Sequence, residues 1–377
     1  MVVRTDNSSL DRILGKCLKG QEITCEEGAS LLQARGLDVW IIAQAADELR
    51  RRTVGDRVTY VKNRNVNFTN VCTMQCGFCA FSVLPGRGGY TMSVEQVKEE
   101  ASTAKKQGCT EVCLQGGINP ALDYRYYLDI CKAVKDVAPD IHIHAFSPME
   151  IKAMADKWGV SVEYCLDALK DAGLGSIPGT AAEILDDGIR RVLCPKKIST
   201  GEWVSVVKAA HKKGIPTTAT MMYGHIEDET HRARHLDLIR SIQKETGGFT
   251  EFIPLSFIHY NTRIYRHPPD GLAVRQGTTG LEDIKVHAVS RLMLAGAIDH
   301  IQVSWPKLGP KLAQMCLDAG CDDLGGTLFS EKITSSAGGG WGQSLSETDI
   351  RDLILGVGRV PAERDTIYRI VDELEAF

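Results

Sequence analysis

Three of the twelve cysteines lie close together in the sequence, as Cys72, Cys76 and Cys79. This Cys-x3-Cys-x2-Cys spacing places three soft sulfur ligands on one short loop, and thiolates bind iron–sulfur clusters or zinc. A structural zinc site needs four closed ligands, usually in two Cys-x2-Cys pairs, and no second pair follows in the sequence. The spacing therefore favours a 4Fe-4S cluster with one open iron; a buried or zinc-binding trio is the alternative.

Composition bounds the class of protein. The chain has 377 residues, of which 43% are hydrophobic and 24% charged, with a formal net charge of −4. This balance argues against nucleic acid as a partner, because binding to phosphates needs concentrated positive charge. No apolar run reaches the length of a membrane span, and the start MVVRTDNSSL lacks the pattern of a signal peptide. We therefore expect a soluble cytoplasmic protein whose cysteines stay reduced, with no membrane partner.

From residue 66 onward, short β-branched runs alternate with amphipathic helical stretches such as 93–108 and 161–173, and this rhythm predicts a parallel sheet. The predicted strands are 66–71, 111–115, 141–146, 175–179, 216–223, 249–257, 300–305 and 322–328. Eight such strands predict an α/β fold, a (β/α)8 barrel of the TIM type. In such barrels the strand ends converge on one face, so the cysteine loop after the first strand should lie at the mouth.

Three parts of the chain are expected. Residues 1–60 form a helical N-terminal extension, with helices at 25–36 and 39–52, and residues 61–345 form the barrel. Residues 346–377 form closing helices, at 346–358 and 361–377, packed on the barrel. The irregular stretch 259–280 is too long for a simple connection, so we expect it to be a lid or a substrate loop.

The cysteine spacing behind a first barrel strand resembles that of the radical S-adenosylmethionine (SAM) superfamily. The resemblance implies that Cys72, Cys76 and Cys79 hold one 4Fe-4S cluster and that SAM chelates the open iron. An electron, which an external donor must supply, then splits SAM into methionine and a radical that abstracts hydrogen from a substrate. Phe78 stands where the superfamily has an aromatic residue beside the adenine, and plain packing is its alternative role.

Two further segments are similar to SAM-holding segments of the superfamily. Gln115, Gly116 and Gly117 end the second strand, where backbone without Cβ allows close approach of a ligand. They are similar to the turn Gly-Gly-Glu that takes the SAM amino group, although Ile118 replaces the acid. Glu183 lies in a stretch similar to the one that reaches the SAM ribose, and a helix-dipole partner is its alternative role.

The third strand reads IHIHAF, and the two-residue period puts His142 and His144 on one face. We expect them to face the barrel lumen, with His144 near the mouth as a candidate catalytic or substrate-binding residue and His142 as a core histidine. Ser147 follows at the mouth, either as a substrate contact or as the cap of the helix that Pro148 begins.

The fifth strand, PTTATMMYGHIE, is unusually polar for a buried strand and ends in Tyr223, His225 and Glu227. We expect this cluster to bind a polar substrate, so Tyr223 and His225 are further catalytic candidates. The alternative is that His225 and Glu227 pair with each other. Met221 and Met222 are expected to fill space in the core.

Longer strings, including NRNVNFTNVC, CGFCAFS, EVCLQGGINP and TTATMMYGHIE, resemble the tyrosine-using transferases of deazaflavin (FO) coenzyme biosynthesis. That resemblance implies cleavage of L-tyrosine and addition of its 4-hydroxybenzyl group to 5-amino-6-(D-ribitylamino)uracil. The products are 5-amino-5-(4-hydroxybenzyl)-6-(D-ribitylimino)-5,6-dihydrouracil, 2-iminoacetate, methionine and 5′-deoxyadenosine. A partner radical SAM subunit completes the deazaflavin ring, and the single cysteine motif indicates one half of FO synthase rather than the fused enzyme.

Two other functions stay open at this point. The futalosine branch of menaquinone biosynthesis shares the cysteine loop, but its fourth strand tends to read Pro-Gly-Gly-Gly-Ala-Glu, against PGTAAE at 178–183 here. A metal-binding regulatory protein without catalysis is the alternative from another class. Production of 5′-deoxyadenosine from SAM separates an enzyme from such a regulator.

Overall fold

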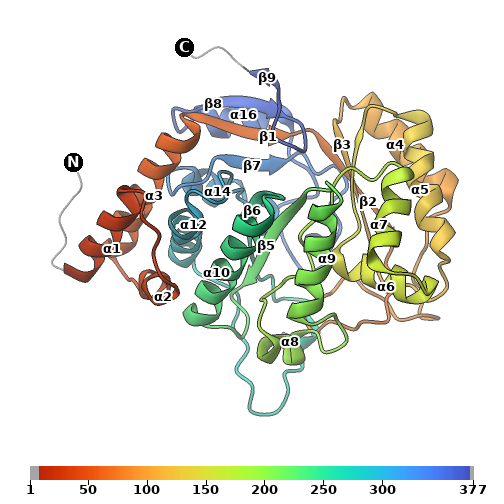
Figure 1. Cartoon of the computed structure of the whole chain (residues 1–377), viewed down its shortest axis with the longest axis horizontal. Coiled ribbons are helices and arrows are strands. Elements are labelled where there is room, and N and C mark those ends of the chain that lie inside the picture. Colours follow the sequence, from red (N-terminus) through yellow and green to blue (C-terminus); the bar gives the residue numbers. More distant parts are fainter. Residues whose placement is uncertain (1–7, 374–377) are drawn as a thin grey trace.

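The computed structural model describes residues 8–373, so the polar start of the chain and residues 374–377 lie outside the described part (Figure 1). The strands are β1 (Arg57–Val61), β2 (Asn63–Thr69), β3 (Glu111–Gly116), β4 (His142–Ala145), β5 (Thr217–Tyr223), β6 (Phe249–Ser256), β7 (Asp323–Gly326), β8 (Val360–Arg364) and β9 (Ile370–Glu373). The longer helices are α1 (Ser8–Leu18), α2 (Cys25–Leu32), α3 (Leu37–Val54), α4 (Val94–Lys106), α5 (Tyr124–Val137), α6 (Pro148–Trp158), α7 (Val162–Asp171), α9 (Thr200–Lys212), α10 (Glu229–Thr246), α12 (Gly280–Leu294), α14 (Pro310–Leu317) and α16 (Glu347–Leu355). The short helices are α8 (Asp187–Leu193), α11 (Arg263–Arg266), α13 (Trp305–Leu308) and α15 (Ile333–Ser336).

The strands form a closed parallel ring. β1 runs on into β2, which pairs with β3, and β3 pairs with β4; β5 pairs with β6, and β7 pairs back to β1. Two very short strands complete the ring through the single parallel pairings of His144 with Ser176, Ile177 with Thr217, Phe252 with Ile301 and Gln302 with Asp323. The predicted (β/α)8 barrel is confirmed, and its eight members correspond to the eight predicted strands. β1 was not predicted: its residues 57–60 fall in the expected helical extension 1–60 but form a strand.

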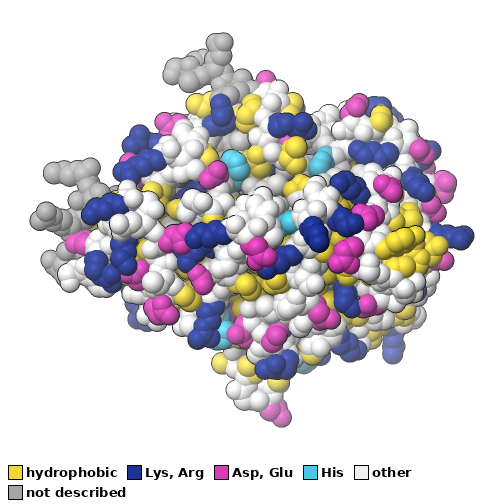
Figure 2. Space-filling view, viewed as in Figure 1, with side chains coloured by type: hydrophobic (Ala, Val, Ile, Leu, Met, Phe, Trp, Pro, Cys, Tyr) yellow, Lys and Arg dark blue, Asp and Glu magenta, His cyan; other side chains and the backbone are white. Residues whose placement is uncertain are grey.

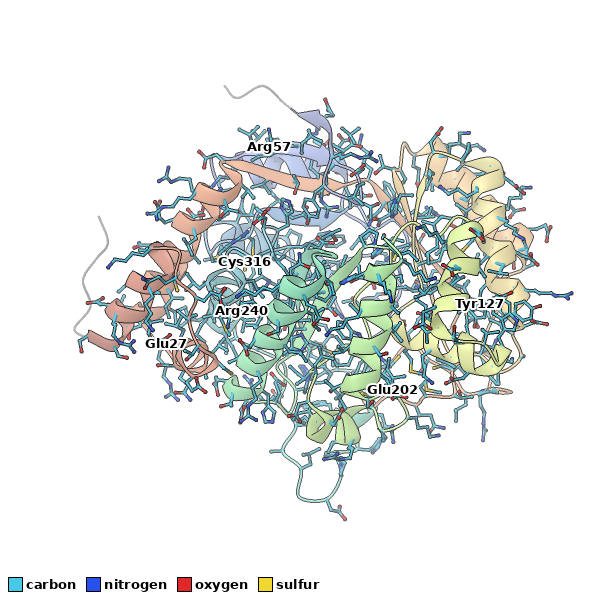
Figure 3. All side chains as sticks on the ribbon, viewed as in Figure 1. Glu27, Arg57, Tyr127, Glu202, Arg240 and Cys316 are labelled. Atoms are coloured by element: carbon cyan, nitrogen blue, oxygen red, sulfur yellow. The ribbon has the colours of Figure 1, made fainter. Side chains whose placement is uncertain are left out.

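Helices cover the outside of the ring, where apolar side chains of the strands meet them. Leu114 and Ile143 are fully buried in one such layer. Serine residues begin several of these helices through reciprocal capping. In α9 the Ser199 side chain accepts from the backbone N–H of Glu202, which Figure 3 labels. Ser147 caps α6 in the same way, so the capping role considered for it is observed.

The N-terminal helices lie at one side of the barrel, next to α10 and α12 (Figure 1). The predicted helices at 25–36 and 39–52 correspond to α2 and α3, whereas α1 was not predicted. Two side chains of the barrel helices bind the loops that connect the N-terminal helices. Arg240 of α10 donates to the Ile23 carbonyl at 3.0 Å, and Lys285 of α12 donates to the Ala34 carbonyl at 3.0 Å.

The closing segment corrects one prediction. The helix expected at 346–358 is present as α16, but the helix expected at 361–377 is wrong over its described residues, which form β8 and β9. β8 pairs in parallel with β1 from Arg57 to Val61, and β9 pairs with β8 in antiparallel fashion. The backbone hydrogen bonds that residues 360–364 form with β1 therefore outweigh the helical propensity of their own sequence.

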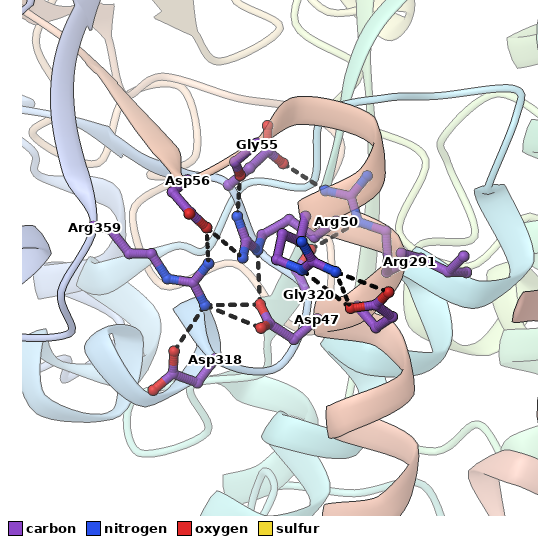
Figure 4. Close-up of polar contacts among 12 residues, drawn as sticks. Asp47, Arg50, Gly55, Asp56, Arg291, Asp318, Gly320 and Arg359 are labelled. Carbon is purple, nitrogen blue, oxygen red and sulfur yellow. Dashed lines mark hydrogen bonds and ion pairs between the residues drawn. The ribbon is translucent and has the colours of Figure 1, made fainter. Parts of the chain in front are cut away.

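An ion-pair cluster fastens the end of α3 to this closing segment (Figure 4). Arg359 has only 9% of its side chain exposed and pairs with Asp47 at 2.9 Å, Asp318 at 3.0 Å and Asp56 at 3.2 Å. Arg50 is fully buried and also pairs with Asp47. One guanidinium therefore joins the N-terminal helices, α14 and β8.

On the molecular surface, Lys and Arg side chains are interspersed with Asp and Glu over the face in Figure 2, as expected from the small net charge. Within residues 8–373, no helix combines the length and the apolarity that crossing a membrane requires.

Replacing Arg359 with methionine should lower the free energy of unfolding by about 1–3 kcal/mol, because three carboxylates lose their shared partner. Urea unfolding of the metal-free protein measures this change. Arg369→Met is the matched control: within residues 8–373 Arg369 pairs with Asp365 alone, and its side chain is 76% exposed, so its loss should cost about 0–1 kcal/mol. Equal losses in the two variants would contradict the fastening role of Arg359.

Candidate active site

The cysteine loop opens onto a cavity of about 340 Å³ at the carboxyl ends of the strands, here called the mouth cavity. The predicted metal and SAM residues that line it are Cys72, Cys76, Cys79, Phe78, Gln115, Gly116, Gly117 and Glu183. They follow three different strands of the ring. The structure therefore brings together every residue that the sequence analysis assigned to the cluster and to SAM.

The three cysteines are free thiols. Burial raises the pKa of Cys76 to about 12, so metal binding must displace its proton. Cys72 Sγ accepts hydrogen bonds from the backbone N–H groups of Met74 at 3.5 Å and Ile118 at 3.3 Å, so two N–H groups point at this sulfur.

Backbone contacts fix the loop that carries these thiols. Gly77 donates to the Leu193 carbonyl at 2.8 Å and accepts from the Ile264 N–H at 2.9 Å. Arg263 donates to the Gln75 carbonyl at 2.9 Å. Ile264 and Arg263 belong to α11 in the stretch 259–280, for which a lid or substrate loop was predicted. This part of the stretch clamps the cysteine loop, and the remainder extends at the lower edge of Figure 1.

The three thiols fit a 4Fe-4S cluster. They converge on one cavity, they are unpaired, and neighbouring N–H groups point at one of their sulfurs, which are the conditions that such a cluster requires. Within the described residues, no three His, Cys, Asp or Glu side chains stand close enough to share one metal ion. A cluster differs from a single ion in binding each cysteine at a separate iron.

Glu150 places a carboxyl group beside the glycine turn of Gly116 and Gly117. In the turn itself, Ile118 stands where the similar Gly-Gly-Glu turn has its glutamate. The turn can approach the cysteine loop only without side chains, because a Cβ on Gly117 would lie 2.3 Å from the Val71 carbonyl oxygen. Glu150 Oε1 accepts from the Gly116 N–H at 3.1 Å, and Oε2 accepts from the Ser147 N–H at 2.7 Å. Sequence reasoning missed Glu150, although Ser147 three residues earlier forms the visible capping-box signal.

Glu183 has a partner that the sequence did not predict. Lys197 donates to Glu183 Oε1 at 2.5 Å, and its ammonium lies 5.1 Å from the centre of the Phe78 ring. The neighbouring carboxylate and thiols raise the pKa of Lys197, so it stays charged. Lys197 follows a short helix and has no local sequence signal, so only the fold places it beside Glu183.

A second cavity of about 180 Å³, here called the lower chamber, lies inside the ring and is lined by Asn65, His144, Thr218, Thr220 and Gln302, among others. His144 faces it as predicted, whereas His142 does not line it. The two histidines share the Ser176 hydroxyl, at 2.6 Å from His144 Nδ1 and 2.7 Å from His142 Nε2. Burial lowers the pKa of His144 to about 4, so His144 is neutral at pH 7.

Tyr223 and His225 line neither of these cavities, which corrects the expectation that the end of the fifth strand forms a substrate cluster. Both are fully buried behind the barrel wall. The Tyr223 hydroxyl donates to Asp283 at 2.7 Å, and His225 Nδ1 lies 3.0 Å from Glu227, the pairing left open as an alternative. On this strand Met222 faces the mouth cavity instead.

Comparisons with known proteins agree with this geometry. Residues 66–239 match the model of the Radical SAM superfamily, and residues 246–376 match that of the CofH/MqnC C-terminal region. The chain is 49% identical over 364 residues, 96% of this chain and 98% of the relative, to 5-amino-6-(D-ribitylamino)uracil–L-tyrosine 4-hydroxyphenyl transferase of Methanothermobacter thermautotrophicus. It is 51% identical over 327 residues, 87% of this chain and 92% of the relative, to the protein of the same name from Archaeoglobus fulgidus.

Solved structures show the same fold at low sequence identity. Methylornithine synthase (PylB) superposes with a TM-score of 0.72 at 19% identity and covers 93% of this chain and 97% of its own. The FeFe-hydrogenase maturase HydG superposes with a TM-score of 0.73 at 15% identity, over 95% of this chain and 77% of its own. The cysteine loop on this barrel defines a radical SAM protein. Within that superfamily, the chain belongs to the family of 5-amino-6-(D-ribitylamino)uracil–L-tyrosine 4-hydroxyphenyl transferases.

Glu150 should make the stability of the metal-free protein depend on pH. Burial raises its pKa from the ordinary 4.5 to about 7, so folding favours the protonated acid, and its contribution to stability is lost as pH rises from about 4.5 to 7. In Glu150→Gln this loss disappears. Urea midpoints of both proteins at pH 5 and pH 7.5 measure the difference.

Glu202→Gln is the matched control, because Glu202 occupies the same capping position in α9 but has a lowered pKa. Its contribution to stability is lost as pH falls, so its removal should leave the decline above pH 5 in place. A decline of equal size in the native protein and in Glu150→Gln would contradict the assignment.

Proposed function

We propose that this chain cleaves L-tyrosine and transfers its 4-hydroxybenzyl group to 5-amino-6-(D-ribitylamino)uracil, the reaction for which its family is named. The observation that carries the proposal is similarity along nearly the whole chain, at 49% identity, to a transferase of that name. Supporting it, the residues expected for a cluster and SAM all line one cavity. The futalosine branch and a regulatory role are the outcomes that the experiments below separate from it.

We further propose that Cys72, Cys76 and Cys79 hold one 4Fe-4S cluster and that SAM binds beside it in the mouth cavity. When bound, the cluster and SAM supply a radical that abstracts hydrogen from tyrosine. Gly116 and Gly117 line this cavity, and their N–H groups already donate to Glu150 and to the Thr69 carbonyl, so we expect their carbonyl oxygens to face the SAM amino group. Phe78 offers a face to the adenine.

Glu183 is positioned for the SAM ribose, because Lys197 holds one of its carboxylate oxygens and leaves the other for a hydroxyl. The apolar part of the cavity wall, including Met74, Phe81, Met149 and Phe257, keeps water from the reacting atoms. An external electron donor and the partner radical SAM subunit remain part of the proposal. The free thiols agree with a reducing cytoplasmic compartment.

The substrates are tested by anaerobic incubation of reconstituted protein with reductant, SAM, L-tyrosine and 5-amino-6-(D-ribitylamino)uracil. We expect the 4-hydroxybenzyl adduct and 5′-deoxyadenosine by mass spectrometry, and no adduct when any one component is omitted. Adduct formed without tyrosine, or consumption of a futalosine precursor in its place, would show a different reaction. A protein that forms no 5′-deoxyadenosine with any of these substrates would fit the regulatory role.

The cluster ligands are tested by comparing Cys76→Ala with Cys109→Ala. Cys76 lines the mouth cavity, whereas Cys109 is buried in the helix layer outside the ring. Cys76→Ala should lose the iron–sulfur absorbance, the bound iron and 5′-deoxyadenosine formation together, and Cys109→Ala should keep all three. If both variants lose the cluster equally, the assignment of the three ligands fails.

A further inference from the structure

The mouth cavity and the lower chamber adjoin within the barrel and share part of their lining. Asn65, Gln115 and Thr180 line both. Their volumes, about 340 and 180 Å³, together fall in the range of about 300–1,000 Å³ that small-molecule sites occupy. The two cavities are therefore large enough to hold a small molecule that extends from one into the other.

The lower chamber presents neutral polar groups with unused hydrogen-bonding capacity. Thr220 donates its hydroxyl hydrogen to the Gly179 carbonyl at 2.8 Å and keeps its oxygen free to accept. Thr218 accepts from the Gly179 N–H at 2.8 Å and keeps its hydrogen free to donate. Asn65 Oδ1 is buried and has no hydrogen-bond partner in the described part of the chain. Donors and acceptors in this mixture fit hydroxyl groups, each of which both donates and accepts.

The charged groups of the lower chamber already have ion-pair or hydrogen-bond partners within the protein. Arg364 binds Asp323 at 2.5 Å and Glu251 at 3.4 Å. Glu111 accepts from the Asn63 side chain at 2.9 Å. A charged ligand would have to compete with these internal partners, whereas a neutral polyol need not.

The mouth cavity has the opposite character. Apolar side chains form much of its wall, and Lys307 from α13 also lines it. Within the described residues, the Lys307 ammonium has no ion-pair or hydrogen-bond partner, whereas the other lysine of the wall, Lys197, is paired with Glu183. A half-buried ammonium that forms no ion pair, beside apolar walls, suits the carboxylate of an aromatic amino acid.

We propose that the two substrates divide the space that the cluster and SAM leave: the ribityl chain of 5-amino-6-(D-ribitylamino)uracil occupies the lower chamber, and L-tyrosine occupies the remaining part of the mouth cavity with its carboxylate at Lys307. This assignment rests on the proposed function and names the subsites of that reaction. The uracil ring then lies at the wall shared by Asn65, Gln115 and Thr180, with its reacting carbon toward the mouth. The hydroxyl chain, which does not react, fills the deep end.

The ribityl subsite is tested with Asn65→Leu, measured by anaerobic equilibrium dialysis of reconstituted protein. The ligands are 5-amino-6-(D-ribitylamino)uracil and 5-amino-6-(methylamino)uracil, which lacks the hydroxyl chain. We expect affinity for the ribityl compound to fall about 3- to 10-fold, while affinity for the truncated compound changes less than about 2-fold. The urea midpoint should not fall, because the Asn65 oxygen has no internal partner to lose.

Asn67→Leu is the matched control, since the Asn67 oxygen is also buried and unpartnered but lines neither cavity. It should bind both uracils as the native protein does. Gln302→Leu, on another strand of the ring, is a second variant that should repeat the effect of Asn65→Leu. Unchanged affinity for the ribityl compound, or equal losses for both compounds, would overturn the lower-chamber assignment.

The tyrosine subsite is tested with Lys307→Met. Affinity for L-tyrosine should fall about 10- to 100-fold with affinity for the ribityl compound unchanged, and tyramine, which lacks the carboxylate, should bind both proteins equally. Loss of ribityl-compound binding in Lys307→Met, or of tyrosine binding in Asn65→Leu, would overturn the division. Adduct formation by the native protein in the omission experiment shows separately whether the proposed reaction itself holds.

Discussion

Parallel pairing of β1 with β7 closes the strand ring, and the arrangement of the site depends on that closure. In a closed parallel ring every strand ends on the same face, so segments from Cys72 to Lys307 meet at one cavity although more than half the chain separates them. The fourth and seventh members of the ring are held by only a few residues each, at Ser176–Ile177 and Ile301–Gln302. Their neighbours therefore fix their positions.

The closing strands contribute to the site as well as to the fold. β8 carries Arg364 into the floor of the lower chamber, where Arg364 meets Asp323 and Glu251. Tyr368 adds a hydrogen bond to Glu251 at 2.5 Å. Desolvating these charges is costly, and their mutual pairing offsets much of that cost. The floor of the lower chamber is therefore polar, and its arginine is already in ion pairs with carboxylates of the protein.

The sequence was sufficient to predict the barrel, its eight strands and the cysteine loop, because these depend on local periodicity and spacing. β8 was missed because the strand that it pairs with, β1, lies at the other end of the chain, from Arg57 to Val61. β9 depends in turn on β8, with which it pairs. Tyr223 was expected at the substrate site because the fifth strand is polar. Every residue of β5 is buried, so polarity does not reveal which face of the strand each side chain takes. Thr218, Thr220 and Met222 share the inner face instead.

Lys197 and Glu150 show why the remaining site residues need the fold. Glu150 follows β4 and accepts from Gly116 at the end of β3. Lys197 pairs with Glu183 of its own segment, 14 residues earlier, and its ammonium lies over the ring of Phe78, which follows β2. No motif of fixed spacing connects the partners that follow different strands. Glu150 is the clearer case, since one carboxylate completes the cap of α6 and also accepts from Gly116 at the end of β3. An acid absent from the glycine turn itself is thereby restored beside it by a neighbouring helix. Comparison of such sites among related barrels therefore has to follow the position of the carboxylate in space, because its position in the motif is not preserved here.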